Sequence, residues 1–297
     1  MKTLFYKYEG PTWLVALALY GGWALLISFH AELSWWLITP VGATLVAWHF
    51  SLQHEAIHSF RSAPAWLRTA AVMPPLGLWL PFPLYRAAHA KHHQNTHLTE
   101  PGVDTESVYL RAADWAALPR WRRELLLFNQ TLTGRVLAGP VLRLEKLVRR
   151  EFARVAAGDF SHLGHWVLHA VLVALLFGYI SGVCAMPWWQ YVIGIAWPAF
   201  GLGWVRSFIE HRHGARPAER TAIVEANLYW RLLFLNNNLH AVHHLYPRMR
   251  WWEIPAYFRD NRERILARNG GFYFRGYFEI ARRWALRPVF TPAHPRF

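Results

Sequence analysis

Four long apolar runs dominate the pattern of hydrophobic and polar positions along this chain. They cover residues 13–28, 35–52, 166–188 and 189–205, and none of them contains Lys, Arg, Asp or Glu. Each run approaches the ~20 residues that an α-helix needs to cross a bilayer. The pattern therefore predicts an all-α integral membrane protein with four transmembrane helices, at about residues 13–30, 35–53, 166–188 and 189–205.

The two polar segments, residues 54–165 and 206–297, have helical patterns of their own. Residues 142–155 are amphipathic and rich in Arg, and residues 226–239 are expected to form a helix that continues into residues 240–244. We expect these segments to form a helical cap. Residues 1–297 would then make a single membrane domain.

The distribution of positive charge predicts the orientation of these spans. Lys and Arg occur before the first run and in the two polar segments, whereas the short turns near residues 30–34 and 185–190 have none. Because positively charged loops stay on the cytoplasmic side of a membrane, both termini and the whole cap are predicted to be cytoplasmic. The localisation that follows is multi-pass integral membrane.

The net charge of +14 at pH 7 is also typical of nucleic-acid-binding proteins. Here most of the positive residues are Arg, and they alternate with Trp, Tyr and Phe beside apolar runs. This combination favours contact with anionic lipid headgroups. We therefore expect a membrane partner and no nucleic acid.

Cys184 is the only cysteine, which excludes an intrachain disulfide, a cysteine-ligated zinc site and an iron–sulfur cluster within the chain. The first apolar run is too long for the core of a signal peptide and lacks a small-residue cleavage site. It is interpreted as a retained span.

Three groups of histidines carry the candidate chemistry. Two of them have the pattern His-x-x-His-His, and the third has two histidines at i, i+4 spacing. Residues three and four apart share a face of a helix, so each group can present its imidazoles together. The three boxes are His54 and His58; His89, His92 and His93; and His240, His243 and His244. Their eight imidazoles are enough for two metal ions, and we predict a dimetal site in the cap.

Other histidine patterns in the sequence favour different roles. The first box also reads His-Glu-x-x-His, the zinc-protease signature, but such a protease has no use for two further boxes beside a membrane. His162, His165 and His169 have helical spacing without a His-His doublet, and we interpret them as structural or interfacial. His97, four residues after His93, either extends the ligand face or lies outside it.

Polar residues near the boxes could hold the ligands in place. Asp104 and Glu106 follow the second box and are candidates to accept hydrogen bonds from ligand imidazoles, which fixes the tautomer. Glu55 is the only carboxylate inside a box. Either His211 or His213 could add a ninth ligand. Imidazole also suits zinc, copper and nickel, so the ligand type alone does not select iron.

The three boxes, with Leu245-Tyr246-Pro247 after the third, resemble the membrane fatty-acid desaturase family and its superfamily of alkane hydroxylases, carotenoid ketolases and lipid hydroxylases. The resemblance extends from about residue 48 to residue 254. It implies a non-haem di-iron centre that uses O2 and external electrons to oxidise an unactivated C–H bond. It implies that the eight box histidines are ligands, and it favours His211, which follows Glu210, over His213 as the ninth. In the same way, an amide from Asn236, Asn237 or Asn238 would lie near a metal-bound water.

Within this resemblance the leading hypothesis is desaturation of a fatty-acyl or acyl-lipid substrate. The alternative is a hydroxylase or ketolase that acts on an alkane, a carotenoid or a polar lipid. Two features keep that alternative open: the first box has three intervening residues where many acyl desaturases have four, and its Glu55 is similar to that of alkane hydroxylases. A membrane protein that stores or senses metal is the hypothesis from another class.

The sequence has no His-Pro-Gly-Gly motif of a cytochrome-b5-like domain. The resemblance therefore implies a separate electron donor, of the ferredoxin, rubredoxin or cytochrome type. Zinc binds nitrogen ligands more tightly than iron(II) does and is expected to replace iron in some purified protein.

Overall fold

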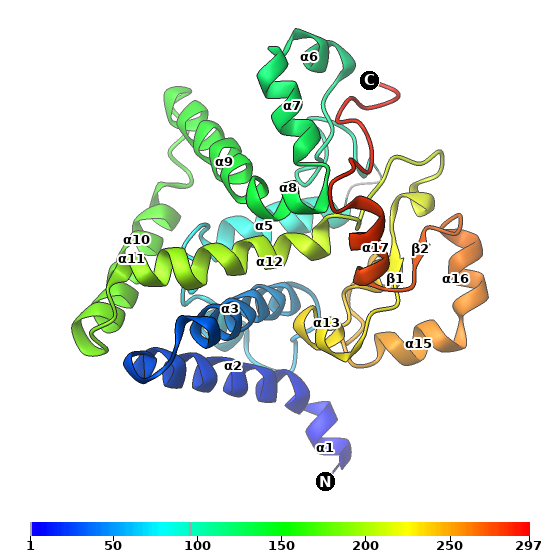
Figure 1. Ribbon diagram of the computed structural model, residues 1–297. Helices are drawn as coiled ribbons and strands as arrows, with labels where there is room; N and C mark the ends of the chain where they lie inside the picture. The colour runs from blue at the N-terminus through cyan, green and yellow to red at the C-terminus, as the bar shows by residue number, and fades with distance from the viewer. Residues whose placement is uncertain (1, 95–96) are drawn as a thin grey trace. The chain divides into compact units, whose positions relative to one another are not determined.

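The computed structural model describes residues 2–94 and 97–297, so residue 1 and residues 95–96 of the predicted single domain lie outside the described residues. The described chain is mostly helical (Figure 1). It divides into two compact units, Met1–Arg86 with Leu142–Gly203, and Ala87–Val141 with Trp204–Phe297. The boundaries between the units fall within or next to three helices: α5 (Phe82–Gln94), α9 (Gly139–Ala156) and α12 (Trp197–Ser207).

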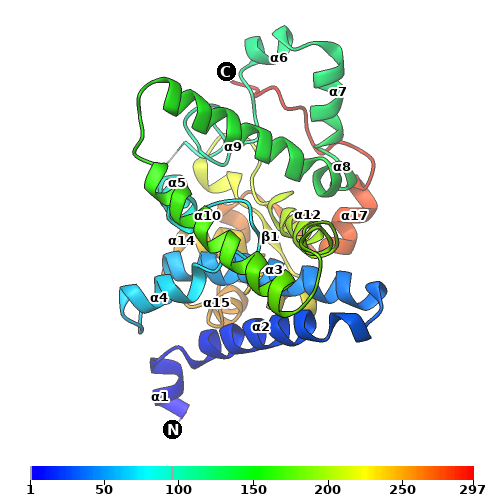
Figure 2. The same cartoon turned by 90° about the vertical axis from the view of Figure 1, so that its left-hand side faces the viewer.

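The first unit is built on two long apolar helices that lie side by side. These are α2 (Gly10–Ser28) and α3 (Trp35–His58), and both views show their packing (Figures 1 and 2). The other elements are the short helices α1 (Lys2–Lys7), η1 (His30–Glu32), α4 (Ala65–Val72) and α11 (Trp188–Tyr191), the helix α10 (Leu163–Phe177), and the π-helical segments η2 (Gly178–Val183) and η3 (Val192–Ala196).

The core of this unit combines apolar packing with one satisfied polar group. The Gly42 position lets α3 approach η3 closely, because a Cβ there would lie 2.9 Å from Ile195. The Tyr191 hydroxyl is buried in the same core; it accepts a hydrogen bond from Trp23 Nε1 at 3.2 Å and donates one to the Leu76 carbonyl at 2.8 Å. Such partners remove most of the cost of burying a phenol.

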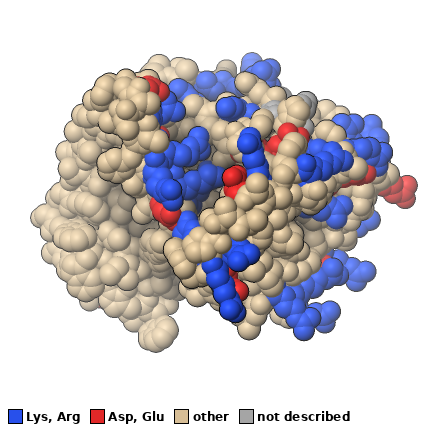
Figure 3. Space-filling view, turned by 90° about the horizontal axis from the view of Figure 1, so that it is seen from above, with Lys and Arg blue, Asp and Glu red and all other residues tan. Residues whose placement is uncertain are grey.

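By length and composition, two described helical stretches could cross a membrane, Gly10–Ser28 and Leu163–Val183. The second is only 11% buried, and its outer face carries apolar side chains such as Val167, Val171 and Leu175. Figure 3 shows an uncharged surface at its left, the side on which α10 and α11 lie in Figure 1. An apolar surface of this kind marks contact with lipid or protein. The predicted four-span arrangement stays a prediction.

The second unit consists of short helices and one small parallel sheet. Strands β1 (Ile223–Val224) and β2 (Tyr273–Phe274) pair with Ile223 opposite Tyr273. The helices are α6 (Ala112–Ala117), α7 (Arg120–Phe128), α8 (Leu132–Leu137), η4 (Pro217–Arg220), α13 (Leu228–Leu233), α14 (His240–Leu245), α15 (Ile254–Asp260), α16 (Arg262–Arg268) and α17 (Tyr277–Trp284).

The sheet and the core of this unit fix the position of α14. The Ala241 amide donates a hydrogen bond to the Ala222 carbonyl at 2.9 Å, and the Val224 amide donates one to the Asn238 carbonyl at 2.9 Å. Val242, on the inner face of α14, is fully buried in a cluster with β1, α15 and α16. The helix that carries the third box is therefore fixed by backbone hydrogen bonds near its start and by apolar packing of its inner face.

The prediction of one helix over residues 226–239 is wrong. Helix α13 ends at Leu233, and Leu235 and Asn236 have left-handed backbones with φ values of 47° and 57°. Asparagine tolerates this conformation better than most residues. The amides of Asn236 and Asn238 donate hydrogen bonds to the backbone carbonyls of Trp251, at 2.9 Å, and Val224, at 2.7 Å. These long-range bonds stabilise a turn that directs the chain into α14.

Candidate metal centre

The second histidine box lies on the last two turns of α5. Its first two histidines, His89 and His92, are buried. The Nδ1 atom of each faces a carboxylate from the loop that follows the helix. His92 Nδ1 donates to Asp104 Oδ1 at 2.8 Å, and His89 Nδ1 donates to Glu106 Oε1 at 2.7 Å. A neutral imidazole that donates through Nδ1 has its lone pair on Nε2, which is the atom left for a metal.

The loop is folded so that the Asp104 carboxylate keeps its place. Besides the bond from His92, its Oδ1 accepts from the Glu106 amide at 2.9 Å and its Oδ2 accepts from the Thr99 amide at 2.8 Å. Thr99 adopts a left-handed backbone, with φ of 73°, and is buried. Three donors thus hold one buried carboxylate in a single orientation.

The third box, on α14, is oriented in the same way. His240 Nδ1 donates to Asn237 Oδ1 at 3.0 Å, in the turn just before the helix. Glu210 Oε1 lies 3.5 Å from the same nitrogen and 3.0 Å from Arg206 Nε. The buried Asn237 amide and the ion pair of Glu210 with half-buried Arg206 therefore lie at the outer edge of the His240 ring.

His211 joins this arrangement from a different segment. Its backbone forms an isolated antiparallel bridge with Thr221, and its Nδ1 lies 3.2 Å from the Arg220 carbonyl, to which it can donate. The protein thus supplies a backbone acceptor to this ring, whereas His89, His92 and His240 have side-chain acceptors.

Four histidines converge through their Nε2 atoms. The Nε2 atom of His211 lies 3.2 Å from that of His92 and 3.1 Å from that of His240, and the latter lies 3.1 Å from His244 Nε2. All four ligand atoms lie within 4.8 Å of one another. We call His92, His211, His240 and His244 the four-histidine group.

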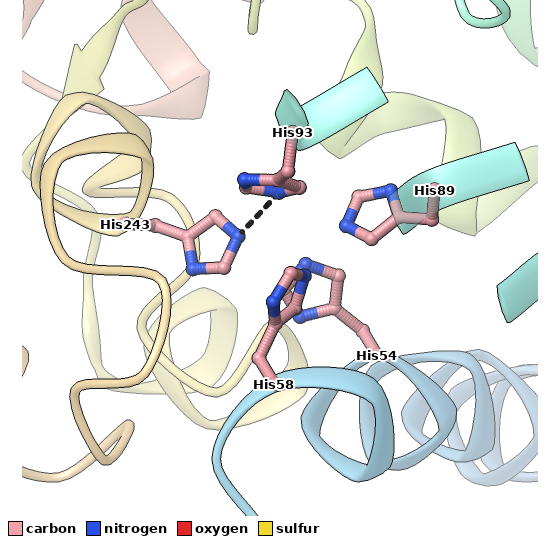
Figure 4. A group of neighbouring side chains, drawn as sticks. All are labelled: His54, His58, His89, His93 and His243. Carbon is pink, nitrogen blue, oxygen red and sulfur yellow. Dashed lines mark hydrogen bonds between the residues drawn. The ribbon is translucent and has the colours of Figure 1, made fainter. Parts of the chain in front are cut away.

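A second set forms beside it from the remaining histidines of α5 and α14. Figure 4 shows His93 and His243 joined at their Nε2 atoms, which lie 3.0 Å apart, with His89 beside them. The ligand atoms of these three also lie within 4.8 Å of one another. We call them the three-histidine group. The ring of His93 stacks on that of His244, with centroids 4.4 Å apart, and so links the two groups.

The first box belongs to the other unit, on the last turns of α3. His54 and His58, which Figure 4 also draws, are buried with ring centroids 4.9 Å apart. Glu55 between them is buried as well; it accepts a short hydrogen bond from the Ser59 hydroxyl, and its Oε1 lies 3.9 Å from His54 Nδ1. The box therefore offers two imidazoles on one helix face beside a fixed carboxylate.

The electrostatics of the four-histidine group differ from ring to ring: burial favours neutral His240, whereas nearby carboxylates favour the protonated form of His92. Burial, and then the charge of His211, lower the pKa of His240 well below its ordinary value. Burial also opposes protonation of His92, but Glu106 and Asp104 outweigh it and raise the pKa of His92 to about 9. Burial alone would raise the pKa of Asp104, yet its hydrogen bond and attraction to His92 hold that pKa below its usual range.

Some histidines named from the sequence lie elsewhere. The His213 ring packs against His294, with centroids 4.8 Å apart, and is in neither group. His97 is largely exposed and lies 2.9 Å from Glu100. His162 bonds Glu151, and His169 Nε2 lies 2.9 Å from a backbone carbonyl.

Several groups that position the site are not among the residues that the sequence predicts. Arg206 lies four residues before Glu210 and Ser59 four after Glu55, so the helical i, i+4 rule could have indicated both pairs. The Thr99 amide and the Arg220 carbonyl are backbone groups. Because almost every residue has an amide and a carbonyl, residue type does not indicate which of them position a ligand.

The described donors fit metal ions. The outer nitrogens of His89, His92, His211 and His240 have acceptors, and the inner nitrogens converge to within the spacing that a shared ion requires. Imidazole donors suit iron as well as zinc and copper.

Comparisons with known proteins agree with this chemistry. A family model described as Fatty acid desaturase matches residues 33–277, which include all three histidine boxes and His211. No curated protein matches the chain.

Proposed function

Because the chain belongs to the fatty acid desaturase family, as the match over residues 33–277 shows, we propose that it oxidises an unactivated C–H bond of a lipid with O2. The observation that carries this proposal is the convergence of histidine Nε2 atoms in two adjacent groups. Family membership and a histidine-rich site together indicate an oxidoreductase that acts on lipid.

The proposed centre holds two iron ions. The four-histidine group would bind one of them, and the three-histidine group, together with His54 and His58, would bind the other. The burial of His54 and His58, their common helix face and their place in the matched region support this assignment. It makes nine ligands, with His211 as the ninth in place of His213.

When bound, the iron ions would supply the O2 chemistry that breaks the C–H bond. The protein's own part is to hold the ligand rings in a fixed orientation. Asp104, Glu106 and Asn237 hold the proton of their partner imidazoles on Nδ1, so that Nε2 stays available. Burial of the rings excludes bulk water from most of the site.

The proposed setting is a membrane surface. The exposed apolar face of α10 and the apolar helix α2 would enter the bilayer, within the four-span arrangement that the sequence predicts. The cap, both termini and the metal centre would then be cytoplasmic, where a separate electron donor of the ferredoxin, rubredoxin or cytochrome type can reach them.

The proposed reaction is desaturation of a fatty-acyl or acyl-lipid chain. The family description and the His-His-Leu-Tyr-Pro ending of the third box support it. Hydroxylation or ketolation of an alkane, a carotenoid or a polar lipid is the second candidate. It is favoured by the buried Glu55 inside a first box with three intervening residues.

Mass spectrometry of lipids and small metabolites tests the proposal, in cells with and without the gene and with a co-expressed electron donor. Desaturation yields a product that has lost two hydrogens. A hydroxyl or keto product without an alkene would select the second candidate. The His243→Ala variant should insert in the membrane and yield neither product. A wild-type protein that holds its metal but consumes no O2 with lipid and donor would instead be a metal store or sensor.

A further inference from the structure

A pocket in the second unit reaches the candidate metal centre. Its volume is about 180 Å³, and His93 and His244 form part of its lining. These two rings stack on each other and belong to different histidine groups. The pocket thus touches the place where the three-histidine and four-histidine groups meet.

The same pocket reaches solvent. Pro217 and Arg268, which also line it, are exposed. His93 and His244 keep part of their surface accessible, whereas the remaining box histidines of this unit are buried: His89, His92, His240 and His243. The pocket therefore adjoins those box histidines that solvent can still reach.

The lining is polar enough to hold water. Asn269 lines the pocket and is 1% exposed; its amide nitrogen donates to the carbonyls of Thr221, at 3.2 Å, and Phe272, at 3.0 Å. Its Oδ1 atom is buried and accepts no hydrogen bond from the residues that the structure describes. A buried acceptor without a protein partner is ordinarily satisfied by ordered water, and the pocket has room for several water molecules.

The proposed oxidation needs a water-filled path between the metal centre and solvent. Removing two hydrogens from a lipid chain with one O2, two electrons from the donor protein and two protons forms a double bond and two waters. The electrons arrive from the donor protein and the lipid chain from the membrane. The protons must reach the buried site from water, and the waters must leave it, by a path that is polar.

We propose that this pocket is the aqueous port of the metal centre, through which protons enter and product water leaves. The inference rests on the proposed function, and it assigns a role to residues outside the ligand set. Ala218, a small residue in the lining, leaves the port open, and the exposed guanidinium of Arg268 favours the approach of small anions.

Azide, a small anion that binds metal ions, is a suitable probe. Stopped-flow absorption of the full-length cobalt(II)-loaded protein in detergent measures azide binding through the visible bands of the metal. Ala218→Trp should slow both binding and release about tenfold or more, because a blocked path changes both rates while leaving the equilibrium affinity nearly unchanged. Arg268→Gln should slow the binding of azide and leave the binding rate of nitric oxide, a neutral probe, unchanged.

Ala215→Trp is the matched control, because Ala215 is exposed in the same segment and is not part of the lining. Ala218→Leu provides a smaller obstruction if the tryptophan variant does not fold, and metal content is measured in every variant. Wild-type azide rates in metal-loaded Ala218 variants would overturn the proposal, as would the failure of azide to reach the wild-type metal. The measurement uses neither lipid nor donor, so an open port in a protein without lipid oxidation would reject the proposed reaction alone.

Discussion

Replacing Asp104 with asparagine removes one charge from the support of the four-histidine group and changes the shape of the side chain very little. In the native protein Oδ1 accepts from His92 Nδ1 and the Glu106 amide, and Oδ2 accepts from the Thr99 amide. Asparagine has a single oxygen. Whichever way its amide turns, the NH2 group must face at least one N–H donor, so a buried hydrogen bond is lost.

The size of the effect follows from these contacts. A hydrogen bond to a charged group contributes about 1.5–3 kcal/mol, and loss of an outer partner of a metal ligand typically weakens metal binding by about 10–100-fold, or roughly 1.4–2.8 kcal/mol. The two ranges agree. We therefore expect Asp104→Asn to weaken one of the two proposed metal sites by about 10–100-fold while the other keeps its affinity.

Competition with a chelator of known affinity measures this loss, with metal content determined by mass spectrometry. Asp114→Asn is the matched control, since Asp114 is exposed on α6. Thermal unfolding of both variants shows whether the fold is retained. If folded Asp104→Asn protein binds both metals within about twofold of the wild-type affinity, the hydrogen bond does not position a ligand.

Three further outcomes are expected. Metal affinity should rise by up to tenfold per pH unit and level off near pH 9, because metal binding must displace the proton of His92, whose pKa is raised to about 9. A chelator titration from pH 6 to pH 10 that gave the same metal affinity throughout would contradict this. His211→Ala should release metal and abolish O2 consumption, whereas His213→Ala should retain both, and equal losses would remove the distinction between them. Gly134→Ala should lower expression and the unfolding temperature, with a loss of at least about 1–3 kcal/mol in the free energy of unfolding, because a Cβ there would collide with the Phe128 carbonyl. An unfolding temperature equal to that of the wild type would show that the turn can relax.

Periodicity in the sequence was sufficient to predict the helices that carry ligands. The i, i+3, i+4 spacing places the histidines of α5 and α14 on helix faces, and the structure has both helices. Acidic residues after the second box, Asp104 and Glu106, were candidates because imidazole ligands need acceptors, and both accept from box histidines. Residue spacing and the chemistry of imidazole thus predict contacts within one or two helical turns and with the loop that follows.

Contacts between distant segments had no such signal. The break before α14 depends on hydrogen bonds from Asn236 and Asn238 to carbonyls of Trp251 and Val224, and nothing in the three asparagines says where those carbonyls lie. Asn237 bonds a ligand ring and its two neighbours bond the backbone, although all three are the same residue type. The tertiary path of the chain, and not composition, separates their roles.

The second and third boxes are each split between the two groups, and this split accounts for the His-x-x-His-His pattern. Helical residues i and i+4 differ by roughly 40° around the axis, whereas i+3 lies roughly 60° to the other side of i. On α5 the i, i+4 pair, His89 and His93, enters the three-histidine group and His92 enters the other; on α14 the assignment is reversed. In the proposed centre each doublet would therefore serve two metals. A box that serves one metal would need only the i, i+4 pair, and His54 and His58 have that spacing. The four-histidine group then has one place left after the boxes are counted, and His211 fills it from a separate segment.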